Sequence, residues 1–213
     1  MAGLLEGKTA LVFGVANRRS IAWAIAQALA AEGAKLAFTF QGERIEAGVR
    51  ELAGSVGSSL VLPCDVTKDE DLDAVFDTVG KEFGGLDILI TNASGPVPGS
   101  VESLDEAAWQ KGIDLSLMAH VRLIKAALPH LRKSNSASVL TFTSYSVKQP
   151  IANLLISNSV RAAVTGFART LANEVAPFGI TVNNLLPGYT RTERLEQLAG
   201  ANAKAKGITP EAA

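Results

Sequence analysis

The sequence has one cysteine, two histidines, few aromatic residues and no long apolar run. A single cysteine, Cys64, cannot form an intramolecular disulfide, and no His, Cys or carboxylate spacing indicates a metal site. No apolar run reaches the roughly 18 residues that a membrane-spanning helix requires. The first residues also lack the charged start and the cleavage site of a secretory signal peptide. These absences predict a cytoplasmic protein without a metal, a disulfide or a membrane span.

An excess of charge of one sign is also missing. The chain has 20 Lys and Arg residues and 21 Asp and Glu residues, which gives a net charge of −1. No Lys/Arg-rich block is present that could attract nucleic acid or an anionic membrane surface. We therefore expect a small or carrier-borne ligand, and neither nucleic acid nor a membrane as a partner.

Apolar residues, by contrast, make up 47% of the 213 residues. This is enough to bury one sizeable core, and the chain is too short for two comfortable domains. Short β-prone runs alternate with helical patterns along the chain, which is typical of parallel strands joined by crossover helices. The six expected strands are Thr9–Gly14, Ala34–Phe40, Ser58–Pro63, Asp87–Asn92, Ser138–Thr143 and Ile180–Leu185.

The expected helices lie between and after these strands, at Ser20–Glu32, Glu43–Ala53, Lys68–Phe83, Leu104–Lys133 with a break, Leu155–Val175 and Arg191–Ala203. Ser103 and Glu106 are spaced as in a capping box at the start of the long segment. The sequence thus predicts an α/β fold: one doubly wound Rossmann-type domain over residues 1–213, with parallel strands in the order 3-2-1-4-5-6. Such a sheet normally continues to a seventh strand, so we expect either a truncated chain or a dispensable last strand.

The turn after the first strand predicts a dinucleotide loop. In a doubly wound sheet this turn faces the ligand crevice, where the N–H groups that begin the next helix can bind a pyrophosphate. Gly14 allows a tight turn there, and further glycines are absent, so Ala16 and Ser20 must let the backbone approach the phosphates. An ordinary strand-to-helix turn is the alternative.

The end of the second strand carries Gln41, where an acidic residue normally binds the adenosine ribose of NAD. Gln41 can bind the ribose hydroxyls without charge. Arg18, Arg19 and Arg44 are candidates for binding the extra phosphate of NADP, or are solvated surface residues. Glu43 lies near the place of that phosphate and disfavours it, so we expect NAD as cofactor, with a modest preference for NADH over NADPH.

The first part of the chain resembles a known family. Residues 3–89, with the runs TALVFGVANRRSIAWAIAQAL and LPCDVTKDEDLDAV, resemble bacterial NADH-dependent enoyl-acyl-carrier-protein reductases. Residues 91–195, with the run SNSVRAAVTGFARTLANEVAPFGITVNN, are similar to 3-oxoacyl-acyl-carrier-protein-reductase-like members of the wider short-chain dehydrogenase/reductase superfamily. The resemblance implies NAD(P)H-dependent reduction of an enoyl or 3-oxoacyl thioester in fatty acid biosynthesis, by a homodimer or homotetramer.

The same resemblance assigns cofactor contacts along the chain. It implies that the pyrophosphate, the riboses and the adenine are bound by Gly14, Ser20, Ile21, Gln41, Asp65, Val66, Asn92, Ala93, Ser94 and Gly95. It implies that the nicotinamide end is held by the loop residues Pro187, Gly188, Thr190 and Thr192. Helix capping by Asp65, Thr190 or Thr192, and a plain turn after Asn92, are the alternatives.

The catalytic pattern of the superfamily is incomplete here. Its members use a proton-donating Tyr, a Lys four residues later and a Ser at the preceding strand end. At these positions stand Ser157, Arg161 and Ser144. Arg161 can still bind the ribose, but a Ser hydroxyl does not donate a proton as a phenol does. Arg161 is therefore expected both at the cofactor and among the catalytic residues.

Two tyrosines are left as possible proton donors. Tyr145 follows Ser144 in a pair that resembles the enoyl reductase strand end, whereas Leu154 stands where that family has its second Tyr. The catalytic candidates are thus Ser144, Tyr145, Ser157 and Arg161, with Tyr189 a weaker one and packing the alternative for both tyrosines. The second hypothesis is a dinucleotide-binding sensor or partner subunit with weakened catalysis.

Overall fold

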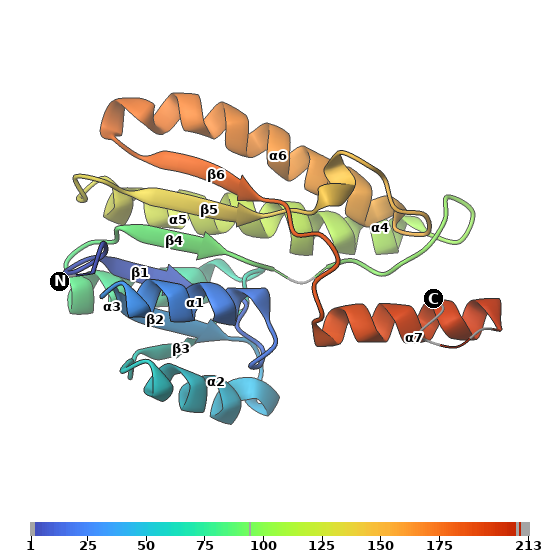
Figure 1. Ribbon diagram of the computed structural model, residues 1–213. Coiled ribbons are helices and arrows are strands. Elements are labelled where there is room, and N and C mark those ends of the chain that lie inside the picture. Colours follow the sequence, from blue (N-terminus) through green and yellow to red (C-terminus); the bar gives the residue numbers. More distant parts are fainter. Residues whose placement is uncertain (1–2, 94, 208, 210–213) are drawn as a thin grey trace.

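The computed structural model of the protein describes residues 3–93, 95–207 and 209, so the expected contact Ser94 lies outside the described residues. Six parallel strands form one sheet in the order β3-β2-β1-β4-β5-β6, which confirms the predicted order (Figure 1). The strands are β1 (Thr9–Val12), β2 (Lys35–Phe40), β3 (Val61–Pro63), β4 (Ile88–Thr91), β5 (Ser138–Phe142) and β6 (Thr181–Leu185). The order reverses between β1 and β4, where a doubly wound sheet opens its crevice.

Helices pack on both faces of the sheet. They are α1 (Ile21–Ala31), α2 (Glu43–Ser55), α3 (Asp69–Phe83), α4 (Glu106–Ile113), α5 (Ala119–Leu131), α6 (Leu155–Val175) and α7 (Glu193–Lys206). The buried residues of α1 and α2 join one core cluster, and those of α3, α5 and α6 join the other. Helix α7 follows β6 and extends beyond the sheet (Figure 1).

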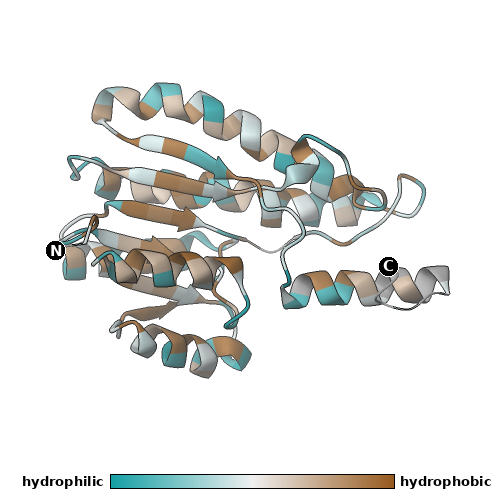
Figure 2. Ribbon diagram, viewed as in Figure 1, coloured by the Kyte–Doolittle hydropathy of each residue, from teal (hydrophilic) through white to brown (hydrophobic). Residues whose placement is uncertain are grey.

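Successive residues of the central strands pack into opposite core clusters, one on each face of the sheet. Leu11 packs with α3 and α5, whereas its neighbour Val12 packs with α1 and α2, and both are fully buried. Leu89 and Ile90 of β4 divide in the same way. Because successive strand side chains point to opposite faces, a strand covered on both sides must be apolar throughout. Figure 2 shows this hydrophobic band along β1 and β4.

The start of α4 corrects one expectation. Asp105, and not Ser103, caps this helix, with its carboxylate accepting a hydrogen bond from Ala108 N at 2.8 Å. Ser103 instead accepts one from Ser100 N at 2.9 Å, within the preceding turn. Asp caps a helix as well as Ser does, and its charge also favours the positive helix end. The break expected in the long segment is a π-helix, Asp114–Met118, which joins α4 to α5.

Among the residues that the structure describes, no helix is long and apolar enough to cross a membrane, and no group of three or more His, Cys, Asp or Glu side chains could hold a metal ion. His120 lies at the start of α5, is 2% exposed, and its Nδ1 lies 2.7 Å from Thr91 Oγ1 at the end of β4. Burial lowers the pKa of His120 to about 4, and the Arg161 guanidinium acts in the same direction. The neutral imidazole therefore supports the sheet beneath the crevice.

We expect acid to destabilise the wild type more than a His120→Gln variant. The folded pKa lies below the ordinary 6.5, so the unfolded chain takes up the proton first as the pH falls. The contribution of neutral His120 to the free energy of unfolding is therefore fully present above pH 6.5. It is lost as the pH falls to about 4, a decrease of about 3 kcal/mol. Urea unfolding of both proteins at several pH values between 7 and 4 measures it, and parallel pH dependences would contradict it.

Candidate active site

Gly14 lies two residues after the end of β1, at the point where the strand order reverses. Its φ is +78°, and a Cβ there would lie 2.5 Å from Asn92 Nδ2 and 2.7 Å from the Asn92 carbonyl oxygen. Asn92 follows β4, and its amide donates to Gly14 O at 3.2 Å. Only glycine satisfies both the backbone conformation and the close contact. Two predicted cofactor residues thus meet at the centre of the crevice.

The start of α1 has the features that favour an anion at a helix end. Ser20 caps the helix: its Oγ accepts from Trp23 N at 3.3 Å and donates to Asn17 O at 2.8 Å. The first turn of α1 contains no acidic residue, so no side-chain charge opposes an anion at the positive helix end. A cavity of about 330 Å³ lies beside it, lined by Arg18, Arg19, Ser20, Ile21, Ala24, Leu185, Pro187 and Thr190. Four predicted residues, from two distant segments, therefore share one cavity.

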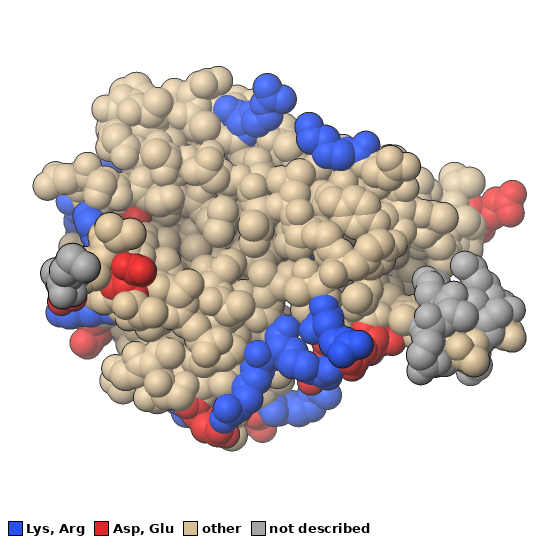
Figure 3. All heavy atoms as spheres, viewed as in Figure 1, with Lys and Arg blue, Asp and Glu red and all other residues tan. Residues whose placement is uncertain are grey.

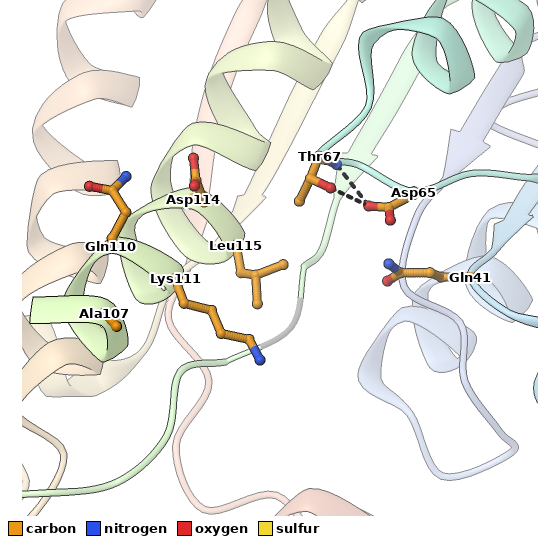
Figure 4. Close-up of a pocket in the computed structure, with 8 residues that line it drawn as sticks. All are labelled: Gln41, Asp65, Thr67, Ala107, Gln110, Lys111, Asp114 and Leu115. Atoms are coloured by element: carbon orange, nitrogen blue, oxygen red, sulfur yellow. Dashed lines mark hydrogen bonds between the residues drawn. The ribbon is translucent and has the colours of Figure 1, made fainter. Parts of the chain in front are cut away.

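A second cavity, of about 650 Å³, lies at the β2 and β3 ends (Figure 4). It is lined by Gln41, Asp65, Thr67, Ala107, Gln110, Lys111, Asp114 and Leu115. The Asp65 carboxylate accepts hydrogen bonds from Thr67 N at 3.0 Å and Thr67 Oγ1 at 2.7 Å. Partial burial acts to raise the pKa of Asp65, but hydrogen bonds from Thr67 and Gln41 hold it below its usual value. Asp65 is thus an ionised acceptor at the predicted adenosine end, and Lys68, not Asp65, occupies the cap position of α3.

Helix α4 and the following π-helix supply a wall of this cavity that the sequence reasoning missed. Lys111 and Leu115 extend from that wall toward the loops that carry Gln41 and Asp65 (Figure 4). Five residues of this wall line the cavity: Ala107, Gln110, Lys111, Asp114 and Leu115. Their spacing of three and four residues places them on one side of the helix. The same spacing is typical of any packed helix, so no sequence signal distinguishes this side as part of a site.

Arg161 lies across the end of β5. Its Nη1 donates to Thr143 O at 3.0 Å and Phe142 O at 3.4 Å, and its Nε donates to Ser157 Oγ at 3.1 Å. Ser157 and Arg161, which are four residues apart, therefore lie on one face of α6 and contact each other. Ser144 follows at once and caps the short helix Tyr145–Val147, its Oγ accepting from Ser146 N at 3.1 Å. The strand end thus combines a fixed positive charge with a hydroxyl.

The loop after β6 ends where α7 begins. Thr192 caps α7, its Oγ1 accepting from Leu195 N at 3.3 Å, so the capping alternative holds for this residue. Arg19 forms ion pairs with Glu193 at 3.6 Å and Glu196 at 2.6 Å. Figure 3 shows cationic side chains over the starts of α1, α2 and α7, with acidic ones beside them. These pairs connect the loop before α1 to the start of α7.

The other expected contacts are less closely grouped. Val66 packs against the core cluster of α3 and α5 and is absent from the cavity lining. Ala16 and Gly188 are exposed, and Ala93 and Gly95, which follow Asn92, are half-buried. Their cofactor roles therefore stay predictions.

A doubly wound parallel sheet, a glycine turn at its switch point and a cation at the β5 end define a Rossmann-type oxidoreductase of the short-chain dehydrogenase/reductase class. The family profile described as Enoyl-(Acyl carrier protein) reductase matches residues 14–212. Enoyl-[acyl-carrier-protein] reductase [NADH] FabI of Bacillus cereus is 38% identical over 198 residues, which are 89% of this chain and 75% of that protein. The chain belongs to the enoyl-acyl-carrier-protein reductase family.

Solved structures agree with this membership. The enoyl-[acyl-carrier-protein] reductase (NADH) of Aquifex aeolicus matches with a TM-score of 0.85 at 34% identity, covering 89% of this chain and 76% of that one. The Bacillus cereus reductase with NADP+ and indole naphthyridinone matches with a TM-score of 0.84 at 33% identity, covering 92% and 83%. The family match runs without a break through Asp87–Asn92, where the sequence predicted a change of likeness. The likeness to 3-oxoacyl-acyl-carrier-protein reductases therefore holds at the level of the superfamily.

Proposed function

We propose that this protein reduces an enoyl thioester, carried by acyl-carrier protein or coenzyme A, with NADH as the hydride donor. The observation that carries this proposal is the pair of cavities lined by predicted cofactor residues, in a chain that matches the enoyl reductase family over residues 14–212. One cavity contains the predicted adenosine residues and the other the predicted pyrophosphate residues. Reduction of a 3-oxoacyl thioester is the less favoured alternative, because the likeness to 3-oxoacyl-acyl-carrier-protein reductases holds only at the level of the superfamily.

The residues present fit a nicotinamide dinucleotide. Gln41 and the ionised Asp65 would bind the adenosine part, and the acid-free start of α1 would bind the pyrophosphate. Arg161 and the loop of residues 187–192 would hold the nicotinamide end. When bound, NADH supplies a hydride, and the protein supplies placement and electrostatics.

The chain's own polar groups at the β5 end would act on the thioester. Ser144 accepts a hydrogen bond from Ser146 N and carries a hydroxyl proton that can be donated to a thioester carbonyl. Arg161 stays protonated at ordinary pH and would stabilise negative charge developing on the substrate. Ser157 is positioned to accept from Arg161 and is not a proton donor of phenol type. We therefore propose that Ser157 and Arg161 replace the usual Tyr and Lys, and that proton supply comes from elsewhere in the site.

Fluorescence titration and thioester turnover test this function. NADH and NADPH are titrated first, and crotonyl and acetoacetyl thioesters are then added while NADH absorbance is followed. We expect NADH to bind and to be oxidised with the crotonyl thioester. Failure of both nucleotides to bind would refute the dinucleotide site, and binding without turnover of either thioester would refute the reductase.

We propose that the protein binds NADH with a modest preference over NADPH, and that an exposed acidic residue causes this preference. Glu43 begins α2, two residues after Gln41, and would repel the extra phosphate of NADPH. We expect NADPH to bind about threefold to tenfold more weakly than NADH, because an exposed charge contributes about 1 kcal/mol or less. Glu43→Gln should reduce this ratio, whereas Glu46→Gln, which loses only the pair with Arg50, should not. Equal ratios in the wild type and in Glu43→Gln would contradict the assignment.

We also propose a homodimer or homotetramer in the cytoplasm. Helices α5 and α6 cover the same face of the sheet, and in a symmetric oligomer the same surface of each copy meets its equivalent. Light scattering after gel filtration measures the mass, and a mass equal to one chain would contradict the oligomer.

A further inference from the structure

The two tyrosines of this chain meet although they lie in different loops. Tyr145 follows β5 and Tyr189 follows β6, and their ring centroids are 5.6 Å apart with the rings tilted by 54°. The backbone holds the loops together, because Thr143 N donates to Leu185 O at 2.9 Å and Tyr145 N donates to Pro187 O at 3.1 Å. The pairing of the neighbouring strands thus continues beyond their ends and sets the two rings side by side.

This pair lies next to the groups already assigned to the reaction. Ser144 immediately precedes Tyr145, and Arg161 donates to Thr143 O one residue earlier. The α6 positions at which the superfamily and the enoyl reductases carry a Tyr are Ser157 and Leu154 here. Any phenol that acts in this site must therefore come from the loop pair. Tyr145 is half-buried, whereas Tyr189 is 73% exposed and so open to an incoming ligand.

We infer that Tyr189 is a catalytic residue that shares with Tyr145 the donation of the proton in thioester reduction. The inference rests on the proposed function. The β-carbon of the enoyl thioester receives hydride from the reduced nicotinamide dinucleotide, which is thereby oxidised, and the electrons of the carbon–carbon double bond move to form an enolate. A phenol O–H of the pair breaks, its proton bonds to the α-carbon, and the phenolate then takes a proton from water. The saturated thioester has gained one hydride and one proton.

The electrostatics of the pair indicate that the two hydroxyls interact. Hydrogen bonding with the Tyr189 hydroxyl raises the pKa of Tyr145, and desolvation adds to the effect. This is the expected effect when a phenol donates its own proton to a neighbouring oxygen. Tyr145 therefore gives up its proton less readily than a free phenol does, and Tyr189 is the exposed member of the pair, placed to meet the substrate first.

Phenylalanine variants test the pair. We expect Tyr189→Phe and Tyr145→Phe each to lower kcat with the crotonyl thioester about tenfold or more, with little change in the Kd for NADH. Because the hydroxyls act as a unit, the double variant should be scarcely slower than the slower single one. Phe178→Leu, which changes a half-exposed aromatic before the opposite end of β6, is the matched control and should keep wild-type kcat.

A spectroscopic titration provides a readout besides turnover. Tyrosinate absorbance followed against pH should show the Tyr145 pKa moving down toward its ordinary value in Tyr189→Phe. An active wild type together with an unchanged kcat and pH–rate profile in Tyr189→Phe would overturn the inference while leaving the reductase intact. A wild type that binds NADH but reduces no thioester would overturn the proposed function, and the inference with it.

Discussion

Replacing Gly14 with alanine should weaken NADH binding about 100-fold, which corresponds to roughly 3 kcal/mol. A left-handed backbone costs a residue with a Cβ about 1–2 kcal/mol. In addition, the new Cβ would lie 2.7 Å from the Asn92 carbonyl oxygen. That oxygen belongs to the backbone following β4, so relieving the collision requires the β1 and β4 ends to separate. The movement would displace the turn that presents the start of α1 to the pyrophosphate.

Fluorescence titration of Gly14→Ala with NADH measures this effect, and circular dichroism confirms that the variant is folded. Gly57→Ala is the matched control, because Gly57 has a φ of +76° but nothing within 4 Å of its Cβ position. The control should lose about 1–2 kcal/mol of stability and keep its affinity for NADH. Wild-type affinity in Gly14→Ala would show that the turn does not hold the phosphates.

Replacing Arg161 with alanine should lower kcat/KM for the crotonyl thioester about 100-fold, since removing one preorganised electrostatic group commonly costs that much. The change removes the fixed charge at the β5 end and leaves the Phe142 and Thr143 carbonyls without their guanidinium donor. NADH affinity should fall as well, because the superfamily resemblance places this residue at the nicotinamide ribose. Arg161→Lys should be intermediate, since one ammonium cannot reproduce the planar fork of donors.

Ser157→Ala is the comparison for Arg161→Ala. It removes only the acceptor for Arg161 Nε and leaves both carbonyl contacts in place, so we expect less than about a threefold change in kcat/KM. Steady-state kinetics and NADH titration of both variants decide the question. Equally small effects of the two substitutions would contradict the assignment of Arg161 to the active site.

Much of the site followed from local sequence. Gly14 and Gln41 lie within two residues of strand ends, and parallel strands bring their carboxyl ends to one edge of the sheet. Helical spacing alone placed Ser157 and Arg161 on one face of α6. The cap of α4 was assigned wrongly, because Ser103 and Asp105 are both good caps and only the path of the chain selects between them.

Other members of the site depend on contacts between distant segments. Lys111 lies on a helical side with no distinctive pattern, and it becomes a cavity residue only because α4 faces the β2 and β3 ends. The two tyrosines meet because β5 and β6 are neighbours in register. The ion pairs of Arg19 likewise join its loop to α7, far along the chain.

The sequence by itself determined the doubly wound sheet, its strand order and the crevice at the β1 and β4 ends, because the alternation of apolar strand runs with helical patterns, and a glycine after the first strand, can be read along the chain. Only the tertiary structure decided which side chains share a cavity, where the Arg161 charge is held, and that the two phenols lie together. These depend on how the loops beyond the strands pair and on where the helices pack, and such long-range contacts leave no local pattern in the sequence.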